Sequence, residues 1–175
     1  MKNFKSAMVL LVLFTLIITG TSMAGSMNKK GNVGILTPAE EAGLLFMREE
    51  EKLARDVYLV LLDKWGLRVF ENIAASEQRH MDAVLYLLGK YGLDDPVLAP
   101  GFFQNTDLQD LYDDLVAKGE KSIVDAIDVG ILIEETDIED IEDLIGQTDK
   151  KDIIQVYTNL LDGSYSHLEA FKSHL

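Results

Sequence analysis

Residues 67–91 carry apolar side chains at the three-to-four-residue spacing of a helix that buries one face. Two ionisable residues, Glu77 and His80, interrupt this apolar line, which we call the seam of the helix. A carboxylate in an apolar core is costly unless something pairs with it. Because Glu-x-x-His places an oxygen and a nitrogen ligand on one helix face, a metal ion is one candidate partner. The alternative is a solvated glutamate beside an ordinary core histidine. The seam consists of Phe70, Ile73, Glu77, His80, Val84, Leu87 and Tyr91.

The sequence predicts four long helices and one short helix. Thr37 and Glu40 form a capping box before the first of them, and Gly66 follows its last apolar residue. About thirty residues separate the second and third long helices, far more than a hairpin turn needs. That length fits a connection that runs along a helix bundle and carries the short helix. Thr148 is the expected N-cap of the last helix. The expected ranges are 38–65, 67–91, 106–117 (short), 122–145 and 149–175.

Each long helix has a polar residue near the middle of its seam. Glu51 is the acid on the first seam, and the second carries the pair described above. On the third seam the acid is Glu134, with Glu135, about 100° further round the helix, as the alternative. The fourth seam carries Ser164 and His167, spaced like the pair on the second helix but with a serine in place of the glutamate. Four helices with matching polar positions predict one shared polar site.

The other acidic residues of these helices fall beside the seams. Asp137, one turn after Glu134, could contact a ligand residue from outside the site. Six of them are predicted to face water: Glu49, Glu50, Glu139, Asp140, Glu142 and Asp143.

Three carboxylates and two imidazoles make a ligand set suited to iron, manganese or zinc and poor for copper(I). The predicted metal ligands are Glu51, Glu77, His80, Glu134 and His167. The chain has no cysteine, which excludes disulfides, thiolate metal sites and iron–sulfur clusters. The alternative without a metal pairs Glu51 with Arg55 or Arg79. It leaves both histidines neutral beside hydroxyl groups such as those of Tyr58 and Ser164.

Residues 1–24 have the composition of a signal peptide. Lys2 and Lys5 precede an apolar run, and small residues up to Ala24 suit cleavage after that position. We therefore expect export to an extracellular or periplasmic space, with an N-terminal membrane anchor as the alternative, and a flexible lead-in over 25–36. The net charge of −14 becomes −16 once the two lysines are removed. Such acidity disfavours nucleic acid as a partner.

The pattern resembles the ferritin-like superfamily, whose four-helix bundles carry a Glu on two helices and Glu-x-x-His on the other two. The run from Glu51 to Tyr58 is similar to the first-helix signature of rubrerythrins, where Glu is followed at the same spacing by Ala-Arg and Tyr. Over about 38–175 the chain looks most like the domain of unknown function 2202 family. That likeness rests on the Glu-Glu-Glu-Lys-Leu-Ala-Arg-Asp-Val-Tyr run, the crossover with its short helix, and a C-terminal Ser-x-x-His-Leu-x-Ala-Phe pattern.

The resemblance implies an all-α, ferritin-like four-helix bundle over 37–175 that holds up to two iron ions, with manganese or zinc as alternatives. It makes Glu51 and Glu134 metal ligands, Glu77 a bridging or chelating ligand, and His80 and His167 the terminal ligands of the two metals. The implied activity is a non-haem oxidoreductase acting on peroxide, oxygen or ferrous iron.

Two departures from the family pattern leave alternatives open. Ser164 stands where the superfamily has a fourth carboxylate, so the site could hold two metals with an open position, one metal or none. The rubredoxin tail of rubrerythrins is absent, so electrons for peroxide reduction would come from an external donor. A hydrogen bond from Tyr58 to a ligand or oxidant, and a homodimer, are further expectations. The alternative function is a non-catalytic metal-binding or interaction module.

Overall fold

The computed structural model describes residues 34–175, which form five α-helices and no strand. The all-helical prediction is therefore confirmed for this range. The signal peptide expected over 1–24 lies outside the described residues, as does most of the lead-in expected over 25–36. Between 34 and 175 no helix is long and apolar enough to cross a membrane. The helices are α1 (Pro38–Trp65), α2 (Arg68–Tyr91), α3 (Thr106–Gly119), α4 (Ile123–Ile145) and α5 (Lys151–Lys172).

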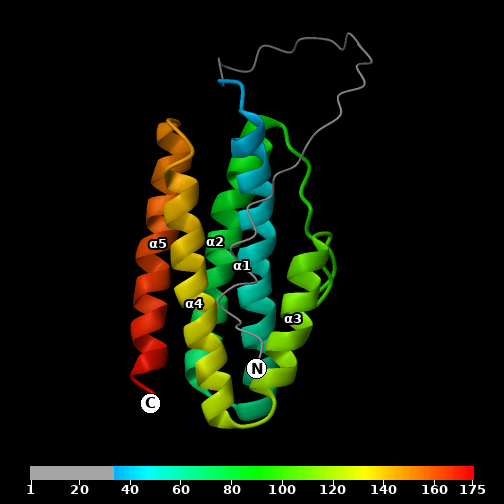
Figure 1. Ribbon diagram of the computed structural model, residues 1–175, viewed down its shortest axis with the longest axis vertical. Helices are drawn as coiled ribbons and strands as arrows, with labels where there is room; N and C mark the ends of the chain where they lie inside the picture. Colours follow the sequence, from blue (N-terminus) through cyan, green and yellow to red (C-terminus); the bar gives the residue numbers. More distant parts are fainter. Residues whose placement is uncertain (1–33) are drawn as a thin grey trace. The chain divides into compact units, whose positions relative to one another are not determined.

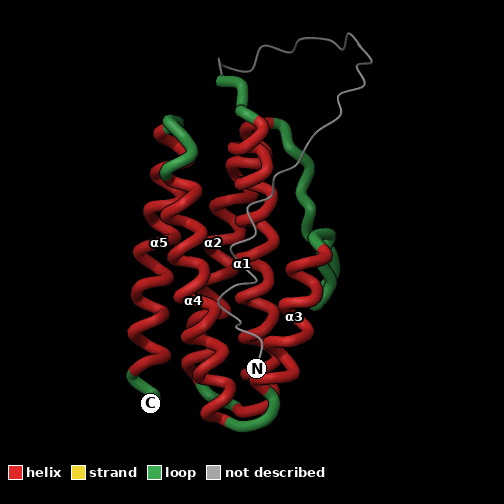
Figure 2. The backbone as a smooth tube through the Cα atoms, viewed as in Figure 1, coloured by secondary structure: helices red, strands yellow, loops and turns green. Residues whose placement is uncertain are grey.

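The four long helices form two antiparallel hairpins, α1 with α2 and α4 with α5 (Figure 1). The hairpins lie side by side, because α1 also packs against α4 and α2 against α5. The connection after α2 runs back along the bundle, so α2 and α4 point in the same direction (Figure 2). It carries α3, which packs on the outside against α1 and α4.

The start of α1 is fixed by the predicted capping box. The Thr37 hydroxyl accepts a hydrogen bond from the Glu40 backbone N–H, and the Glu40 carboxylate accepts one from the Thr37 N–H. The prediction of Thr148 as the N-cap of the last helix is wrong, because Lys150 holds that position without a side-chain cap. The Thr148 hydroxyl instead donates to Glu40 at 2.6 Å. Thr148 thus ties the start of α5 to the start of α1.

The spacing of apolar residues predicts that the seam of the third long helix begins at Val124 and continues through Ile127. The prediction is wrong for Val124, which is 64 % exposed, whereas Ile127 is buried as expected and the buried line continues through Gly130 and Ile133. A Cβ atom at Gly130 would lie 2.7 Å from ring carbons of Phe171 on α5. The ring therefore occupies the space that a side chain at this glycine would need. The buried face of α4 is thus centred on the side of Gly130 and Ile133, and Val124 lies off it.

The connection between α2 and α3 covers the side of α1 that faces away from the seam. Lys52 is fully buried there and donates to Asp56 at 2.6 Å. Glu49, predicted to face water, is buried because its carboxylate accepts the backbone N–H groups of Gln104 and Asn105 just before α3. The spacing of apolar residues predicts one covered face for α1, and the connection before α3 covers a second face.

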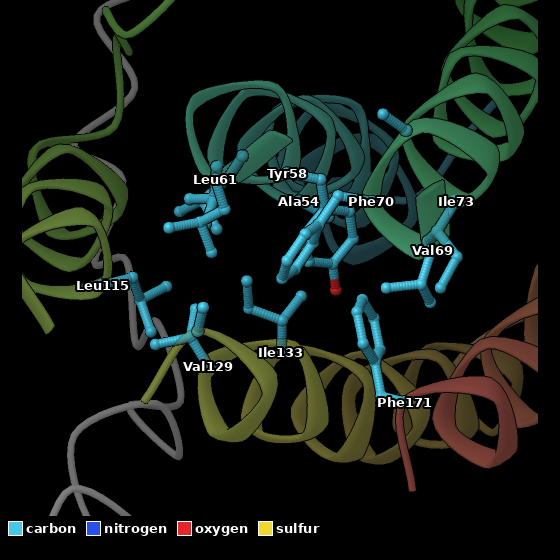
Figure 3. Close-up of a cluster of buried hydrophobic side chains, with 14 of the residues drawn as sticks. Ala54, Tyr58, Leu61, Val69, Phe70, Ile73, Leu115, Val129, Ile133 and Phe171 are labelled. Carbon is cyan, nitrogen blue, oxygen red and sulfur yellow. The ribbon is translucent and has the colours of Figure 1, made fainter. Parts of the chain in front are cut away.

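Two apolar clusters fill the core between the long helices. One surrounds the aromatic rings of Tyr58, Phe70 and Phe171 (Figure 3). The other gathers near the opposite ends of the same helices and includes Met47 and Val84. On every long helix the predicted site residues lie in sequence between members of the two clusters. The polar site is therefore a layer closed by apolar packing on both sides.

Candidate metal centre

Two groups of side chains among residues 34–175 could hold a metal ion, since their ligand atoms all lie within 4.8 Å of one another. The first group is Glu51, Glu77 and His80, and the second is Glu77, Glu134 and His167. All five predicted ligands are brought together. Glu77 belongs to both groups, so the two potential ion positions are neighbours.

The carboxylate of Glu77 presents one oxygen to each group. Its Oε2 lies 2.8 Å from Nδ1 of His80, and its Oε1 lies 2.9 Å from Nδ1 of His167. Glu51 Oε2 is 3.2 Å from the first of these nitrogens, and Glu134 Oε2 is 3.4 Å from the second. The imidazole rings stack with centroids 5.5 Å apart. The Glu77 carboxylate therefore has one oxygen directed to each of the two ligand groups.

The backbone of α5 fixes the orientation of His80. A Cβ atom added at Gly163 would lie 2.6 Å from both Cε1 and Nε2 of the ring. The imidazole therefore packs directly against the backbone of α5, and only glycine at position 163 leaves room for it. With Nε2 on that side, Nδ1 is the nitrogen that faces the carboxylates of Glu51 and Glu77.

Tyr58 orients the carboxylate on α4. Its buried hydroxyl donates to Oε1 of Glu134 at 2.6 Å, which leaves Oε2 for the histidine of the second group. Burial raises the pKa of Tyr58 well above its ordinary value, so the phenol remains a neutral donor. Its ring packs near Phe70 and Phe171, with the hydroxyl oxygen between Ile133 and Phe171 in Figure 3.

The choice between neighbouring glutamates on α4 is resolved by burial. Glu134 is 1 % exposed and lies in the second ligand group. Glu135 is partly exposed, with one carboxylate oxygen 3.9 Å from the Lys172 ammonium group. Glu134 is therefore the acid that enters the core.

Protons balance the charges of the site in the metal-free chain. Burial raises the pKa of Glu134 to about 8 and that of Glu51 well above its ordinary value. Although burial opposes it, contacts with both histidines lower the pKa of Glu77 to about 2. Against the same opposition, the carboxylates raise the pKa of His80 to about 11 and that of His167 to about 9. Two imidazolium rings therefore hold the positive charge near neutral pH.

This proton balance leaves buried polar atoms unsatisfied. Oε1 of Glu51 has no hydrogen-bond partner, and the 2.9 Å contact between Oε1 of Glu77 and Nδ1 of His167 lacks the alignment of a hydrogen bond. A buried oxygen without a partner, such as Oε1 of Glu51, costs about 1–3 kcal/mol. Carboxylate oxygens and imidazole nitrogens are ligands for iron, manganese and zinc, so the donor set fits metal ions of this class.

Two further acids, Glu50 and Asp140, are at least partly buried, contrary to the expectation that they face water. Glu50 is 4 % exposed, and neither carboxylate oxygen has a hydrogen-bond partner. Burial and the nearby charges of Asp137 and Asp140 raise its pKa well above the ordinary value. Asp140 is partly buried rather than solvated. Their burial was not predicted because burial beside a seam depends on the neighbouring helix, here α4 against α1. The acids at 139, 142 and 143 are exposed as predicted.

Ser164 is fully buried. It occupies the position on α5 where a second Glu-x-x-His motif, ending at His167, would have its glutamate. Its hydroxyl donates to Oδ2 of Asp137 on α4 at 2.5 Å and also lies 3.0 Å from the Leu160 carbonyl oxygen. Asp137 is 6 % exposed, and its Oδ1 has no partner. Burial raises the pKa of Asp137 to about 7. Asp137 is thus a buried neighbour of the two ligand groups.

The pairings expected for a metal-free core are not the ones formed. Neither arginine pairs with Glu51, and neither hydroxyl forms a hydrogen bond with a histidine. Arg55 binds Asp56 and Gln78, Arg79 binds Ser76, Tyr58 binds Glu134, and Ser164 binds Asp137. Glu51 contacts His80 instead.

Comparisons with known proteins identify relatives without an assigned function. The model of an uncharacterized protein domain family, DUF2202, matches residues 40–175. The uncharacterized protein MJ0754 of Methanocaldococcus jannaschii is 55 % identical over 138 residues, which cover 78 % of this chain and 75 % of that protein. A crystal structure titled as hypothetical protein MJ0754 from Methanococcus jannaschii superposes with a TM-score of 0.77 at 52 % identity. That match covers 84 % of this chain and 83 % of the other.

Proposed function

The chain belongs to the DUF2202 family of uncharacterized domains, and we propose that it holds two metal ions in a ferritin-like bundle as a non-haem oxidoreductase. Iron or manganese are the proposed ions, and peroxide, oxygen or ferrous iron the proposed substrates. The observation that carries the proposal is the Glu77 carboxylate, with one oxygen toward each of two ligand groups.

The arrangement of the helices supports the ferritin-like part of this proposal. Two antiparallel hairpins joined by a long crossover are typical of that superfamily. Its ligands also project inward from all four long helices near mid-length, as the site residues do here. Fold alone does not define an activity, so the functional part rests on the site.

The residues of the chain have distinct roles in this proposal. Glu51 and Glu134 would each hold one ion, and Glu77 would contribute to both. His80 and His167 would ligate after they release their protons, so metal uptake would be coupled to proton release. When bound, iron or manganese would supply electrons to peroxide or oxygen, or the position at which ferrous iron is oxidised.

The surroundings of the site suit redox chemistry. Tyr58 holds Glu134 through its hydroxyl and keeps its own proton, and the apolar clusters on both sides exclude water. The chain has no cysteine, so it lacks the thiolate ligands of a rubredoxin centre. Electrons for peroxide reduction are therefore proposed to come from an external donor.

Turnover by metal-loaded protein tests this proposal. Iron- or manganese-loaded protein is expected to consume peroxide or oxygen over many cycles when a chemical reductant is supplied. Zinc-loaded protein is the matched control, because zinc takes the same ligands but has no redox chemistry. Equal rates for the iron, manganese and zinc forms would contradict an oxidoreductase.

Ser164 favours a second candidate function, a metal-binding module without turnover. A serine hydroxyl is a weak neutral ligand compared with a carboxylate, and this one is already engaged with Asp137. A module of this kind would bind ions tightly and show no catalytic rate with any of the three metals.

A further inference from the structure

Asp137 is a buried carboxylate with a free oxygen. It lies on α4 one turn after Glu134 and is 6 % exposed. One oxygen, Oδ2, accepts the Ser164 hydroxyl, whereas Oδ1 has no hydrogen-bond partner. A buried carboxylate oxygen without a partner is costly. A cation in the adjacent layer would remove that cost.

The contact between α4 and α5 occurs at the position where a carboxylate is missing. Glu77 and His80 on α2 have the same three-residue spacing as Ser164 and His167 on α5. The side chain at the glutamate position of α5 is therefore a hydroxyl, and that hydroxyl holds a carboxylate from the neighbouring helix. The carboxylate function absent from α5 is supplied beside it by α4.

Asp137 belongs to neither group of mutually close ligand atoms. It lies three residues after Glu134 on α4, and its Oδ2 contacts Ser164, which lies three residues before His167 on α5. Residues three apart share one face of a helix. Asp137 therefore lies beside the layer that contains Glu134 and His167.

Charge balance gives Asp137 a reason to take part. Two divalent ions bring four positive charges into a layer closed by apolar clusters, and Glu51, Glu77 and Glu134 balance three of them. A fourth carboxylate balances the last, and an unbalanced charge is costly in such a layer. The superfamily pattern also contains four carboxylates. Asp137 restores that number without a glutamate at 164.

We infer that Asp137 is the fourth carboxylate of the metal centre, using Oδ1 as a ligand atom while Ser164 holds Oδ2. This inference rests on the proposed two-ion site. It assigns Ser164 as a positioning residue for a ligand on another helix, so the serine is compatible with a complete set of four carboxylates.

The first test is metal binding by Asp137→Asn, which keeps the size and can still accept the serine hydroxyl. Calorimetric titration with manganese(II) is expected to show binding weakened about 10- to 100-fold, the loss typical of changes to residues around a metal. Exposed Glu139→Gln on the same helix removes the same charge and is expected to bind like the wild type. Unchanged binding by Asp137→Asn would overturn the inference.

Stability without metal separates a ligand role from a structural role. Removing a buried carboxylate charge is expected to leave the melting temperature of metal-free Asp137→Asn equal to or above that of the wild type. A metal-free variant that melts well below the wild type would instead make Asp137 a structural residue, and the inference would fail.

The double variant Asp137→Ala with Ser164→Glu moves the carboxylate from α4 to α5. The space left by the aspartate side chain helps to accommodate the glutamate. Manganese affinity is expected to recover from the level of Asp137→Ala toward that of the wild type. A double variant as weak as Asp137→Ala would contradict the exchange of one carboxylate between the two positions. Absence of binding in the wild type would overturn the two-ion site itself, a result distinct from failure of Asp137 alone.

Discussion

Gly163→Ala is predicted to damage one half of the metal centre while sparing the other. The new Cβ would lie 2.6 Å from Cε1 and Nε2 of His80, whereas ordinary contacts begin at 3.4 Å. The ring must therefore retreat by roughly 0.8 Å, the difference between these distances, because the core is closely packed. Cε1 of His167 would be at an ordinary 3.8 Å. The first group should lose its histidine geometry and the second should keep it.

Gly89→Ala is the matched control for this substitution. Gly89 lies within α2, is exposed, and has nothing within 4 Å of an added Cβ. Alanine there is expected to stabilise the metal-free protein by about 1 kcal/mol through helix propensity alone. Gly163→Ala gains the same propensity but overpacks the core, so it should fall below the control by about 1–3 kcal/mol.

Urea unfolding of the metal-free proteins and titration with manganese(II) measure the two effects separately. The Gly89→Ala protein should bind as many ions as the wild type, about two. The Gly163→Ala protein should retain about one ion, in the group of Glu77, Glu134 and His167. If Gly163→Ala matched Gly89→Ala in both stability and stoichiometry, the placement of His80 against α5 would be refuted.

Three further predictions concern the same centre. Glu134→Gln should weaken manganese binding at least about 10-fold while Glu135→Gln does not, and equal effects in titration would contradict the assignment of Glu134. Tyr58→Phe should destabilise the metal-free protein by about 1–3 kcal/mol in urea unfolding, because a buried carboxyl oxygen loses its donor; wild-type stability would argue against that bond. Folding raises the pKa of His80 from 6.5 to about 11 and that of His167 from 6.5 to about 9. The protonated rings therefore stabilise the metal-free fold at low pH, and this contribution is lost as the pH rises through the folded-state pKa values. Melting temperatures without metal should therefore fall from about pH 6.5 to about pH 9, and a rise over that interval would contradict the protonated network.

Helical periodicity identified the residues that face the common core. Glu51, Glu77 and Glu134 interrupt apolar seams, and a helix of 3.6 residues per turn turns every seam position in the same direction. The two histidines were found in the same way. These are local properties of single helices, so one sequence was sufficient to predict that these side chains converge.

Burial outside the seams depends on partners that one helix does not specify. Glu49 is covered by the connection before α3, and Glu50 by α4, although both lie beside the seam of α1. Asp137 shows the same limit, because its partner Ser164 comes from another helix. Thr148 bonds to Glu40 at the start of α1 rather than capping α5 for the same reason. Each of these contacts depends on how the helices and the connection before α3 pack against one another. The periodicity of a single helix carries no information about that packing.

The most direct test of a metal centre shared through Glu77 compares the number of ferrous ions bound by the wild type and by Glu77→Gln in anaerobic titration. Exposed Glu71→Gln on the same helix serves as the charge control. Because Glu77 faces both ligand groups, we predict about two ions for the wild type and the control, and loss of both together in Glu77→Gln. A Glu77→Gln protein that still binds two ions with wild-type affinity, or a wild type that binds none, would contradict a shared metal centre.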